Sequence, residues 1–382
     1  MAKRKVLYVT GTRADFGLMA STLRRIAQHP KLELQVAVVG MHLSPAYGLT
    51  VREIEAAGFP IVARVPTPVE ERTPAAMAEG IGQAVTGVTR ALAQARPDLL
   101  LVIGDRGEML AAAIAGLHLG VPVVHLHGGE RSGTVDEPVR HAITKLSHWH
   151  FVATEESRER VIRMGERADR VWITGAPSLD GLQPFIATPR AEVLQTLGLP
   201  ADARYLLVLF HPVVQQGSGM HAQALALARA LHDVAAPRGL HIVWLAPNAD
   251  AGSAEILQAL DDGAGLSRLH RITHLERPLF ISALKQAEAL VGNSSAGIIE
   301  SATVGTPVVN VGSRQQARER NANTHDCECT QEAIRGALEQ QLAHGPYAPG
   351  NRYGDGSAGA RIADLLATLP TSPDLLDKVN TY

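Results

Sequence analysis

The chain has 382 residues, a length typical of two domains. Its 36 lysines and arginines against 38 aspartates and glutamates give a formal net charge of −2, without the basic excess of a general nucleic-acid binder. Hydrophobic residues make up 46% of the chain, enough for sizeable cores, while only 4% are aromatic, which disfavours stacking platforms for single-stranded nucleic acid.

The first half of the chain alternates short apolar runs with helical patterns. The apolar runs predict strands at residues 6–10, 34–40, 99–104 and 121–126, and helices are predicted at 16–27 and 109–119. Most of these runs are rich in β-branched residues and followed by glycine, as in strands that are buried on both faces. The alternation therefore predicts a parallel sheet wrapped by helices.

The same pattern restarts after a boundary that we place near residues 176–186. Strands are predicted at 205–210, 241–245, 289–291 and 307–311, and helices at 190–197, 222–231, 279–286, 297–303 and 358–366. We therefore expect an α/β protein of two doubly wound, Rossmann-like domains, residues 1–180 and 181–382. Ligands of such sheets bind at the carboxyl ends of the strands, so we expect the active site in the interdomain cleft.

The segment after the first strand, residues 11–17, matches no dinucleotide fingerprint. The sequence also contains no GxxxxGK[ST], so nicotinamide binding and P-loop hydrolysis are both disfavoured. Arg13 stands just before a predicted helix, where it could bind an anion together with free backbone N–H groups. A surface ion pair between Arg13 and Asp15 is the alternative interpretation.

Asp105 and Arg106 follow the third predicted strand. Asp105 comes shortly after five apolar residues, so it should project from the carboxyl edge of the sheet. A cap at the amino end of the next helix would be a purely structural use of this carboxylate. The adjacent Arg106 adds a second anion-binding group, which favours a site.

The segment from residue 125 to residue 141 has the densest cluster of charged residues. Its carboxylates are Glu130, Asp136 and Glu137. Crowded carboxylates suit proton transfer, because neighbours can hold one of them with a raised pKa. Asp136 and Arg140 are four residues apart, so a plain salt bridge on one helix face is the alternative. His125 and His127 could begin a metal site, although buried or capping histidines are commoner.

In the second half, His211 follows a strand. Ser294 and Ser295 lie in a turn of small residues before a helix, where hydroxyl and N–H groups could bind a phosphate. Glu300 is one turn into that helix and could accept from ribose hydroxyls. Arg314 follows the next strand and belongs to the same edge.

Together these segments resemble the hydrolysing UDP-N-acetylglucosamine 2-epimerases, of the bacterial sialic-acid and legionaminic-acid pathway type. The motifs that carry the resemblance are residues 12–16, 104–106, 127–130, 136–148, 211–213, 293–297 with Glu300, and 305–310 with Arg314. They extend over most of the chain, to about residue 320. The resemblance implies the two-domain glycosyltransferase-B fold.

The resemblance also implies a reaction. UDP leaves by anti elimination across C1–C2 of the sugar, giving a 2-acetamidoglucal; water then adds at C1 while C2 is reprotonated on the opposite face. The products are UDP and free N-acetylmannosamine, and neither a metal nor a nicotinamide cofactor is implied. The expected partners are the UDP-sugar, UDP and further copies of the chain in a homodimer or homotetramer.

Site residues follow from the matching positions. The catalytic set implied is Asp105, Glu130, Asp136 and His211, with His211 a candidate acid toward the leaving group. The substrate-binding set implied is Arg13, Arg106, Asn248, Ser294, Ser295, Glu300 and Arg314. His141 matches a family histidine, for which a supporting role is an equal alternative.

Some positions depart from the family pattern, notably a shorter loop at 130–136 and the residues at 214–216. They leave the sugar open, so a UDP- or GDP-linked 2,4-diacetamido-6-deoxy sugar is a second candidate substrate. The competing activities are those of a non-hydrolysing 2-epimerase, a glycosyltransferase of the same fold and a non-catalytic nucleotide-sugar sensor. Crowded carboxylates around Glu130 disfavour the sensor, because a binder of anions gains nothing from them.

The only cysteines, Cys327 and Cys329, exclude a disulfide framework and suit a reducing compartment. No second cysteine pair completes a metal motif, so we interpret them as incidental thiols. Neither a signal-peptide core nor an uncharged apolar run of about 18 residues is present. We therefore expect a cytoplasmic protein that has no membrane partner.

Overall fold

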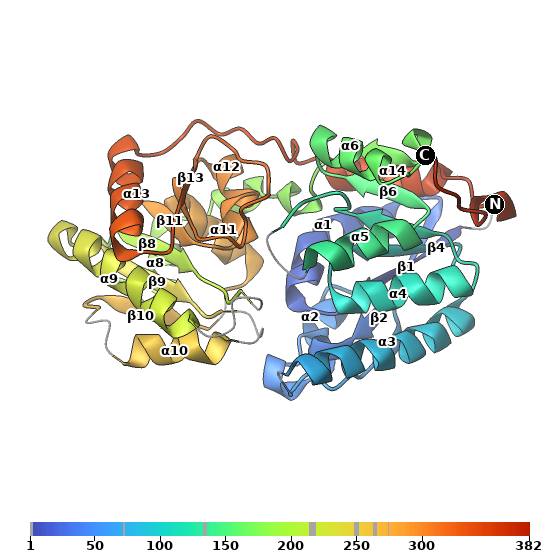
Figure 1. The fold of residues 1–382 in the computed structure, drawn as a ribbon, viewed down its shortest axis with the longest axis horizontal. Coiled ribbons are helices and arrows are strands. Elements are labelled where there is room, and N and C mark those ends of the chain that lie inside the picture. Colours follow the sequence, from blue (N-terminus) through green and yellow to red (C-terminus); the bar gives the residue numbers. More distant parts are fainter. Residues whose placement is uncertain are drawn as a thin grey trace. The chain divides into compact units, whose positions relative to one another are not determined.

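The computed structural model describes residues 3–71, 73–132, 136–213, 219–247, 252–262, 266–273 and 275–382. These residues form two compact units, each built on its own sheet (Figure 1). Unit 1 comprises the described parts of 1–130, 136–180 and 353–382, and unit 2 those of 131–135 and 181–352.

Unit 1 contains a seven-stranded parallel sheet in the order β3-β2-β1-β4-β5-β6-β7. Its strands are β1 (Arg4–Thr10), β2 (Leu32–Val39), β3 (Ile61–Val65), β4 (Leu99–Ile103), β5 (Val123–Leu126), β6 (Trp149–Val152) and β7 (Val171–Ile173). Strands β4, β5 and β6 are buried along their whole length. This burial on both faces explains why the sequence of the central strands is almost continuously apolar.

Helices cover both faces of this sheet. They are α1 (Arg13–Gln28), α2 (Val51–Ala56), α3 (Pro74–Ala95), α4 (Gly107–His118), α5 (Asp136–Leu146), α6 (Glu155–Arg163) and α14 (Ala358–Thr368), with short 3-10 turns at Gly40–Leu43, Pro45–Tyr47, Ala168–Arg170, Pro177–Leu179 and Pro373–Leu375. Successive residues of a strand point to opposite faces. Val6 and Tyr8 accordingly pack with α1 and α14, whereas Leu7 and Val9 pack with α3, α4 and α5.

Unit 2 contains a six-stranded parallel sheet in the order β10-β9-β8-β11-β12-β13. The strands are β8 (Tyr205–Leu209), β9 (His241–Leu245), β10 (Leu269–Ile272), β11 (Ala289–Gly292), β12 (Val308–Val311) and β13 (Thr324–Cys327). The helices are α7 (Gln183–Ile186), α8 (Arg190–Thr196), α9 (Met220–Arg238), α10 (Ser253–Asp261), α11 (Arg277–Gln286), α12 (Glu300–Val304) and α13 (Gln331–His344), with a 3-10 turn at Ser295–Gly297. Residues of α9, α10 and α13 form one buried cluster with the sheet.

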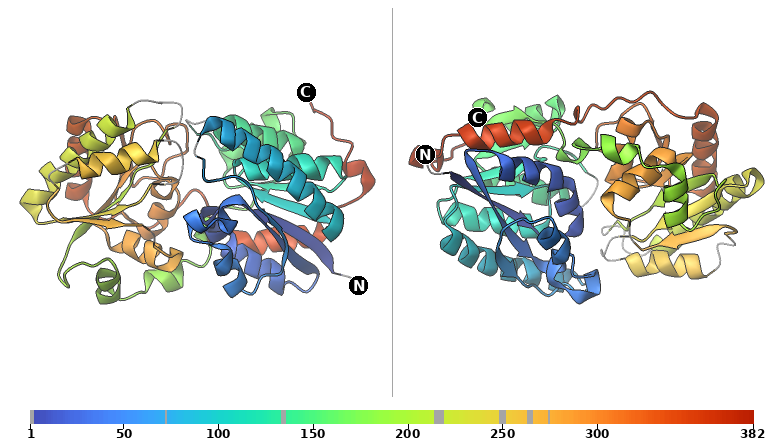
Figure 2. Two further views of the ribbon diagram at one scale, coloured as in Figure 1. Left: turned by 90° about the horizontal axis from the view of Figure 1, so that it is seen from below. Right: turned by 180° about the vertical axis from the view of Figure 1, so that it is seen from behind.

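The predicted architecture of two doubly wound parallel sheets is confirmed. The range 181–382 is wrong at its end, however, because residues 353–382 belong to unit 1. Figure 2 shows α14, in red, against the blue elements of that unit. The backbone N–H of Ala358 donates to Asp180 Oδ1 at 2.9 Å, and Ile362 and Leu366 are buried in the cluster of α1. Periodicity identifies this helix in the sequence but does not say which sheet it covers.

Among the described residues, no helix is long and apolar enough to cross a membrane.

Candidate active site

The predicted site residues lie at the carboxyl edges of the two sheets. In unit 1, Arg13 follows β1, Asp105 and Arg106 follow β4, Glu130 follows β5, and Asp136 is the first residue of α5. In unit 2, His211 follows β8, Ser294 and Ser295 follow β11, Glu300 begins α12, and Arg314 follows β12. Each sheet therefore gathers its own group of polar side chains at one edge, as parallel strands do. Asn248, the remaining predicted residue, lies outside the described residues.

Asp105 is held by an arginine that is distant in sequence. Gly104 has a φ of +75°, which turns the chain at the end of β4, and Asp105 Oδ2 accepts a hydrogen bond from Arg140 Nη2 of α5. The arginine side chain is 1% exposed and that of Asp105 is 23% exposed. The residue at the amino cap of α4 is Arg106. Asp105 is thus an ion-paired carboxylate that solvent can reach, and the capping interpretation is wrong.

Glu130 ends a tight loop after β5. Its Oε1 is hydrogen-bonded to Nδ1 of His127, and its side chain is 4% exposed. Gly129 has a φ of +76°, and a Cβ there would lie 2.3 Å from the carbonyl oxygen of Ser157, so only glycine fits. Arg140 Nη1 donates to the carbonyl oxygen of Glu130 at 3.0 Å. One buried arginine therefore contacts both Asp105 and the Glu130 loop.

His125 supports the same edge from inside the sheet. Its Nε2 lies 2.8 Å from the carbonyl oxygen of Gly104 and its Nδ1 lies 3.1 Å from Thr144 Oγ1. Since a carbonyl only accepts, Nε2 carries the hydrogen and Nδ1 accepts from the hydroxyl group. Burial lowers the pKa of His125 to about 3, so the ring is neutral. Both nitrogens are thus engaged within the protein; among the described residues no three His, Cys, Asp or Glu side chains form a metal-binding group.

Asp15 is a buried carboxylate whose surroundings the sequence did not reveal. It does not pair with Arg13; it forms a capping box with Thr12 at the start of α1. The backbone N–H groups of Gly11 and Thr12 donate to its Oδ2 at 3.1 and 2.9 Å. Burial outweighs these hydrogen bonds and raises the pKa of Asp15 to about 6. The surface-pair alternative is wrong, and Arg13 is half-buried at the start of the helix.

Glu108 is a further carboxylate at this edge that sequence reasoning missed. Its Oε2 lies 3.5 Å from Arg106 Nε. A Cβ on Gly11 would lie 2.8 Å from its Cδ, and a Cβ on Gly40 would lie 3.7 Å from its Oε1. The side chain therefore reaches from α4 across the ends of β1 and β2. Glycines directly after these two strands are the signal that could have indicated it.

His211 in unit 2 is fixed by a side-chain amide. Its backbone N–H donates to Asn293 Oδ1 at 2.7 Å, and Asn293 Nδ2 donates back to the carbonyl oxygen of His211 at 2.8 Å. Burial, together with the guanidinium of Arg314, lowers the pKa of His211 to about 3. The imidazole is therefore neutral at pH 7, and one ring N–H can donate to an anion.

The turn after β11 is built from small residues because the backbone is crowded there. Gly292 has a φ of +140°, and a Cβ on it would lie 2.0 Å from the carbonyl oxygen of Leu209. Ser294 Oγ accepts from the N–H of Ala296 at 3.4 Å. Arg314 Nη1 donates to the carbonyl oxygen of Asn293 at 3.1 Å, which brings this cation to the turn and to His211.

Glu300 lies at the start of α12 and is 4% exposed. Its Oε1 is 3.6 Å from Arg277 Nη2 at the start of α11. This ion pair identifies Arg277 as a neighbour of the predicted ribose-binding carboxylate. Residue spacing does not indicate that contact, because it joins the beginnings of two different helices.

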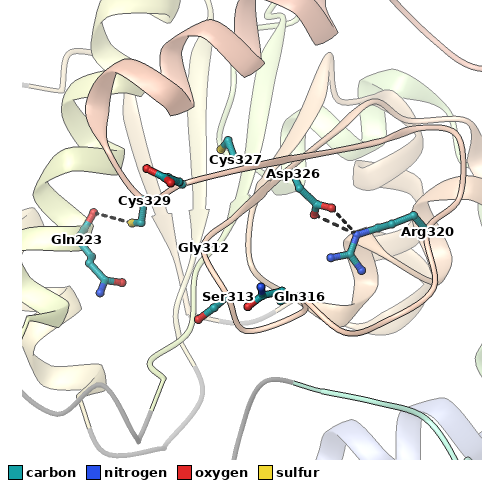
Figure 3. Close-up of a pocket in the computed structure, with 9 residues that line it drawn as sticks. Gln223, Gly312, Ser313, Gln316, Arg320, Asp326, Cys327 and Cys329 are labelled. Atoms are coloured by element: carbon teal, nitrogen blue, oxygen red, sulfur yellow. Dashed lines mark hydrogen bonds and ion pairs between the residues drawn. The ribbon is translucent and has the colours of Figure 1, made fainter.

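A cavity of about 600 Å³ opens in unit 2, and some of its lining residues are neighbours of Arg314 in the sequence (Figure 3). Its lining residues, from the ends of β12 and β13 and the start of α9, are Gln223, Gly312, Ser313, Gln316, Arg320, Asp326, Cys327, Glu328 and Cys329. Arg320 Nε lies 2.9 Å from Asp326 Oδ2. Burial raises the pKa of Cys327 and Cys329 to about 12 and 11, so both thiols are protonated at neutral pH.

Comparisons with known proteins agree with these motifs. A family model described as UDP-N-acetylglucosamine 2-epimerase matches residues 24–367. The chain is 44% identical over 379 residues to the hydrolysing UDP-N,N'-diacetylbacillosamine 2-epimerase of Legionella pneumophila, covering 99% of this chain and 100% of that one. It is 33% identical over 366 residues to the UDP-N-acetylglucosamine 2-epimerase of Neisseria meningitidis, covering 95% of both.

Solved structures show the same fold. The UDP-GlcNAc 2-epimerase from Neisseria meningitidis bound to UDP-GlcNAc superposes with a TM-score of 0.80 at 19% identity, covering 95% of this chain and 99% of that one. The UDP-GlcNAc 2-epimerase from Methanocaldococcus jannaschii, in complex with UDP-GlcNAc and UDP, has the same TM-score at 17% identity, with the same coverage. The architecture is therefore the glycosyltransferase-B type that the sequence predicted.

Proposed function

The chain belongs to the UDP-N-acetylglucosamine 2-epimerase family, and from this we propose that it cleaves a UDP-linked 2-acetamido sugar with water while inverting C2. The observation that carries the proposal is the pair of carboxylates, Asp105 and Glu130, whose chain segments are both held by Arg140. Epimerisation through an elimination needs one group that removes the C2 proton and another that delivers a proton to the opposite face.

We assign the proton chemistry to residues 1–180. Asp105 and Glu130 follow β4 and β5, which are adjacent in the sheet. Adjacent strands lie about 4.8 Å apart, a spacing that lets two carboxyl groups act on one sugar ring. Asp136, the first residue of α5, is the third carboxylate of this group. Arg13 and Arg106 add the positive charge that favours an anionic substrate.

Nucleotide binding is assigned to residues 181–352. The developing charge of the departing diphosphate requires N–H, hydroxyl and cationic donors. His211, Ser294, Ser295 and Arg314 supply them, and Glu300 accepts from the ribose. Because the ring of His211 is neutral, it would first act as an N–H donor; a bound diphosphate would raise its pKa and so increase the protonated fraction that can donate a proton to the leaving group. Asn248 is kept as a substrate contact on the resemblance alone.

For the sugar, we propose N,N'-diacetylbacillosamine carried on UDP. The support is the 44% identity to a hydrolysing epimerase of that nucleotide sugar, which extends over the whole of that relative. A Campylobacter jejuni relative, 30% identical over 86% of this chain, is named for the GDP- or UDP-linked form of the same sugar. UDP-N-acetylglucosamine is the second candidate, favoured by the Neisseria meningitidis relative.

Proton and phosphorus NMR in heavy water tests the reaction with each UDP-sugar in turn. We expect free UDP and a free sugar that carries deuterium at C2 with inverted configuration. We also expect kcat/KM for UDP-N-acetylglucosamine to be lower by roughly tenfold or more, because the groups at C4 and C6 differ. A deuterated sugar still attached to UDP would instead indicate the non-hydrolysing reaction, and no deuterium at C2 would exclude the elimination.

A further inference from the structure

Helix α5 is the element that holds the carboxylate of Asp105 and the backbone of Glu130. Arg140, one turn into the helix, donates to Asp105 Oδ2 and, at 3.0 Å, to the carbonyl oxygen of Glu130. The Arg140 side chain is buried, so it has no room to change conformation and keep its contacts when the helix shifts. A shift of α5 would therefore move both contacts together.

A second tether runs from the last turn of α5. The hydroxyl of Thr144 donates to His125 Nδ1 at 3.1 Å, and His125 Nε2 donates to the carbonyl oxygen of Gly104 at 2.8 Å. Gly104 immediately precedes Asp105 and has a φ of +75°, so this carbonyl helps to fix the turn that presents the carboxylate. The orientation of Asp105 thus depends on both ends of one helix.

Lys378, far along the chain, closes the carboxyl end of that helix. Its Nζ lies 3.1, 2.8 and 2.6 Å from the carbonyl oxygens of Thr144, Lys145 and Ser147. The last carbonyl groups of a helix have no partner within it, and a cation near them also complements the helix dipole. The lysine side chain is 13% exposed, so it is built into the unit.

A buried carboxylate keeps this amine in place. Glu166 Oε2 lies 2.7 Å from Lys378 Nζ and 3.0 Å from His150 Nε2, while its Oε1 lies 2.6 Å from Lys145 Nζ. Lys145 Nζ also donates to Asn380 Oδ1 at 2.7 Å. The segment that carries Lys378 is therefore attached to the end of α5 by two side chains. Lys378 binds carbonyl groups at the end of the helix, and Lys145 of the helix binds Asn380 of the segment.

We propose that Lys378 is a positioning residue for the reaction: by closing the carboxyl end of α5, it holds Arg140 and Thr144 where they orient Asp105 and the Glu130 loop. The inference rests on the proposed function, which assigns these carboxylates to proton transfer. A displacement of about 1 Å in a catalytic group can cost roughly a hundredfold in rate. Lys378 lies at the carboxyl end of α5, whereas Asp136 is at its amino end. Its hydrogen bonds within the described chain go to the carbonyl oxygens of Thr144, Lys145 and Ser147 and its ion pair to Glu166, none of which is a predicted site residue.

The test compares Lys378→Met with Arg4→Met. Arg4 provides a matched control, because its Nη1 donates at 2.6 Å to the carbonyl oxygen of Leu366 near the end of α14, a helix that carries no predicted site residue. We expect Lys378→Met to lower kcat roughly tenfold or more, with KM and the affinity for UDP unchanged. Arg4→Met should keep kcat, and Lys378→Arg should restore most of it. A Lys378→Met enzyme with normal kcat, whatever its thermal stability, would overturn the proposal.

Hydrogen exchange separates this inference from the proposed function. In Lys378→Met we expect faster amide exchange in α5 and in the turn at Gly104, with exchange in β8 and β9 unchanged. In Arg4→Met, α5 and the turn at Gly104 should keep their protection. If the wild-type protein turns over neither UDP-sugar, the proposed function fails. The exchange measurement then still decides whether Lys378 holds α5 and the turn at Gly104 in place. Unchanged protection of α5 and of the turn at Gly104 would contradict it.

Discussion

At the scale of single residues, the candidate site is organised by Arg140. The sequence left open, as purely structural alternatives, a salt bridge between Arg140 and Asp136 and a cap of α4 by Asp105. In the structure Arg140 joins Asp105, 35 positions away, to the loop of Glu130. Such a contact depends on which strand ends lie beside one another, and residue spacing along the chain does not contain that information.

Replacing Asp105 by asparagine should separate catalysis from binding. Asparagine keeps the shape and an oxygen that accepts from Arg140, but it removes the carboxylate needed for proton transfer. We expect turnover to fall by roughly 10²- to 10⁴-fold with UDP affinity unchanged, measured by steady-state kinetics and calorimetry. Asp169→Asn, which changes an exposed carboxylate of the same unit, should leave both unchanged. Weakened UDP binding with normal turnover at saturation would remove Asp105 from the proton chemistry.

Much of this site was accessible to sequence reasoning. Glycines and polar side chains directly after apolar runs placed Asp105, Glu130, His211 and Arg314 at strand ends. The partners that hold them were not accessible: Asn293 binds the backbone of His211 through its side chain, an arrangement that no spacing rule predicts.

At the scale of elements, strands were predicted where the sequence has a long apolar run. Each residue of β8 and of β4 is buried, and both strands were predicted to within one residue. β6, Trp149–Val152, is buried throughout, but His150 interrupts its short apolar run and the strand was not predicted. β13, Thr324–Cys327, was not predicted, because none of its residues is fully buried and it lacks an apolar run. The helix predicted at 297–303 is divided into a 3-10 turn, Ser295–Gly297, and the short α12.

Gly292 is the position where an element and the site depend most directly on glycine. In Gly292→Ala the new Cβ would meet the carbonyl oxygen of Leu209 at 2.0 Å with φ at +140°. We expect the free energy of unfolding of unit 2 to fall by roughly 2–5 kcal/mol, and UDP binding to weaken, in denaturant titrations with and without UDP. Gly336→Ala, in the interior of α13 with no atom within 4 Å, should instead stabilise the unit by up to about 1 kcal/mol. Equal effects at both positions would contradict this account.

At the scale of the whole molecule, the sequence predicted two domains and a boundary near residue 180, where the chain passes from the first domain to the second. It did not predict that residues 353–382 return to unit 1. Hydrophobic periodicity reports that a helix has an apolar face, and the same face could cover either sheet. The choice is made by long-range contacts, among them Asp180 with the first turn of α14.

Truncating Ile362 of α14 tests that assignment. The side chain is fully buried in the cluster that contains Phe16 and Met19. Ile362→Ala should therefore cost unit 1 about 2–5 kcal/mol of unfolding free energy, seen as faster amide exchange in β1 and α1. Exchange in unit 2 and the affinity for UDP should not change. Faster exchange in β8 and β11 instead would place α14 with the other sheet.

The order in which a ribosome makes the chain gives the discontinuity of unit 1 a further meaning. Chains are synthesised from the amino terminus and their domains fold as units. Residues 181–352 are thus synthesised before α14 has been made, although the sheet of unit 1 was translated first. Until translation passes residue 369, the apolar side chains that α14 covers in unit 1, such as Phe16 and Leu23, have no complete partner surface. The apolar face that α14 covers is therefore the part of unit 1 that is completed last during synthesis.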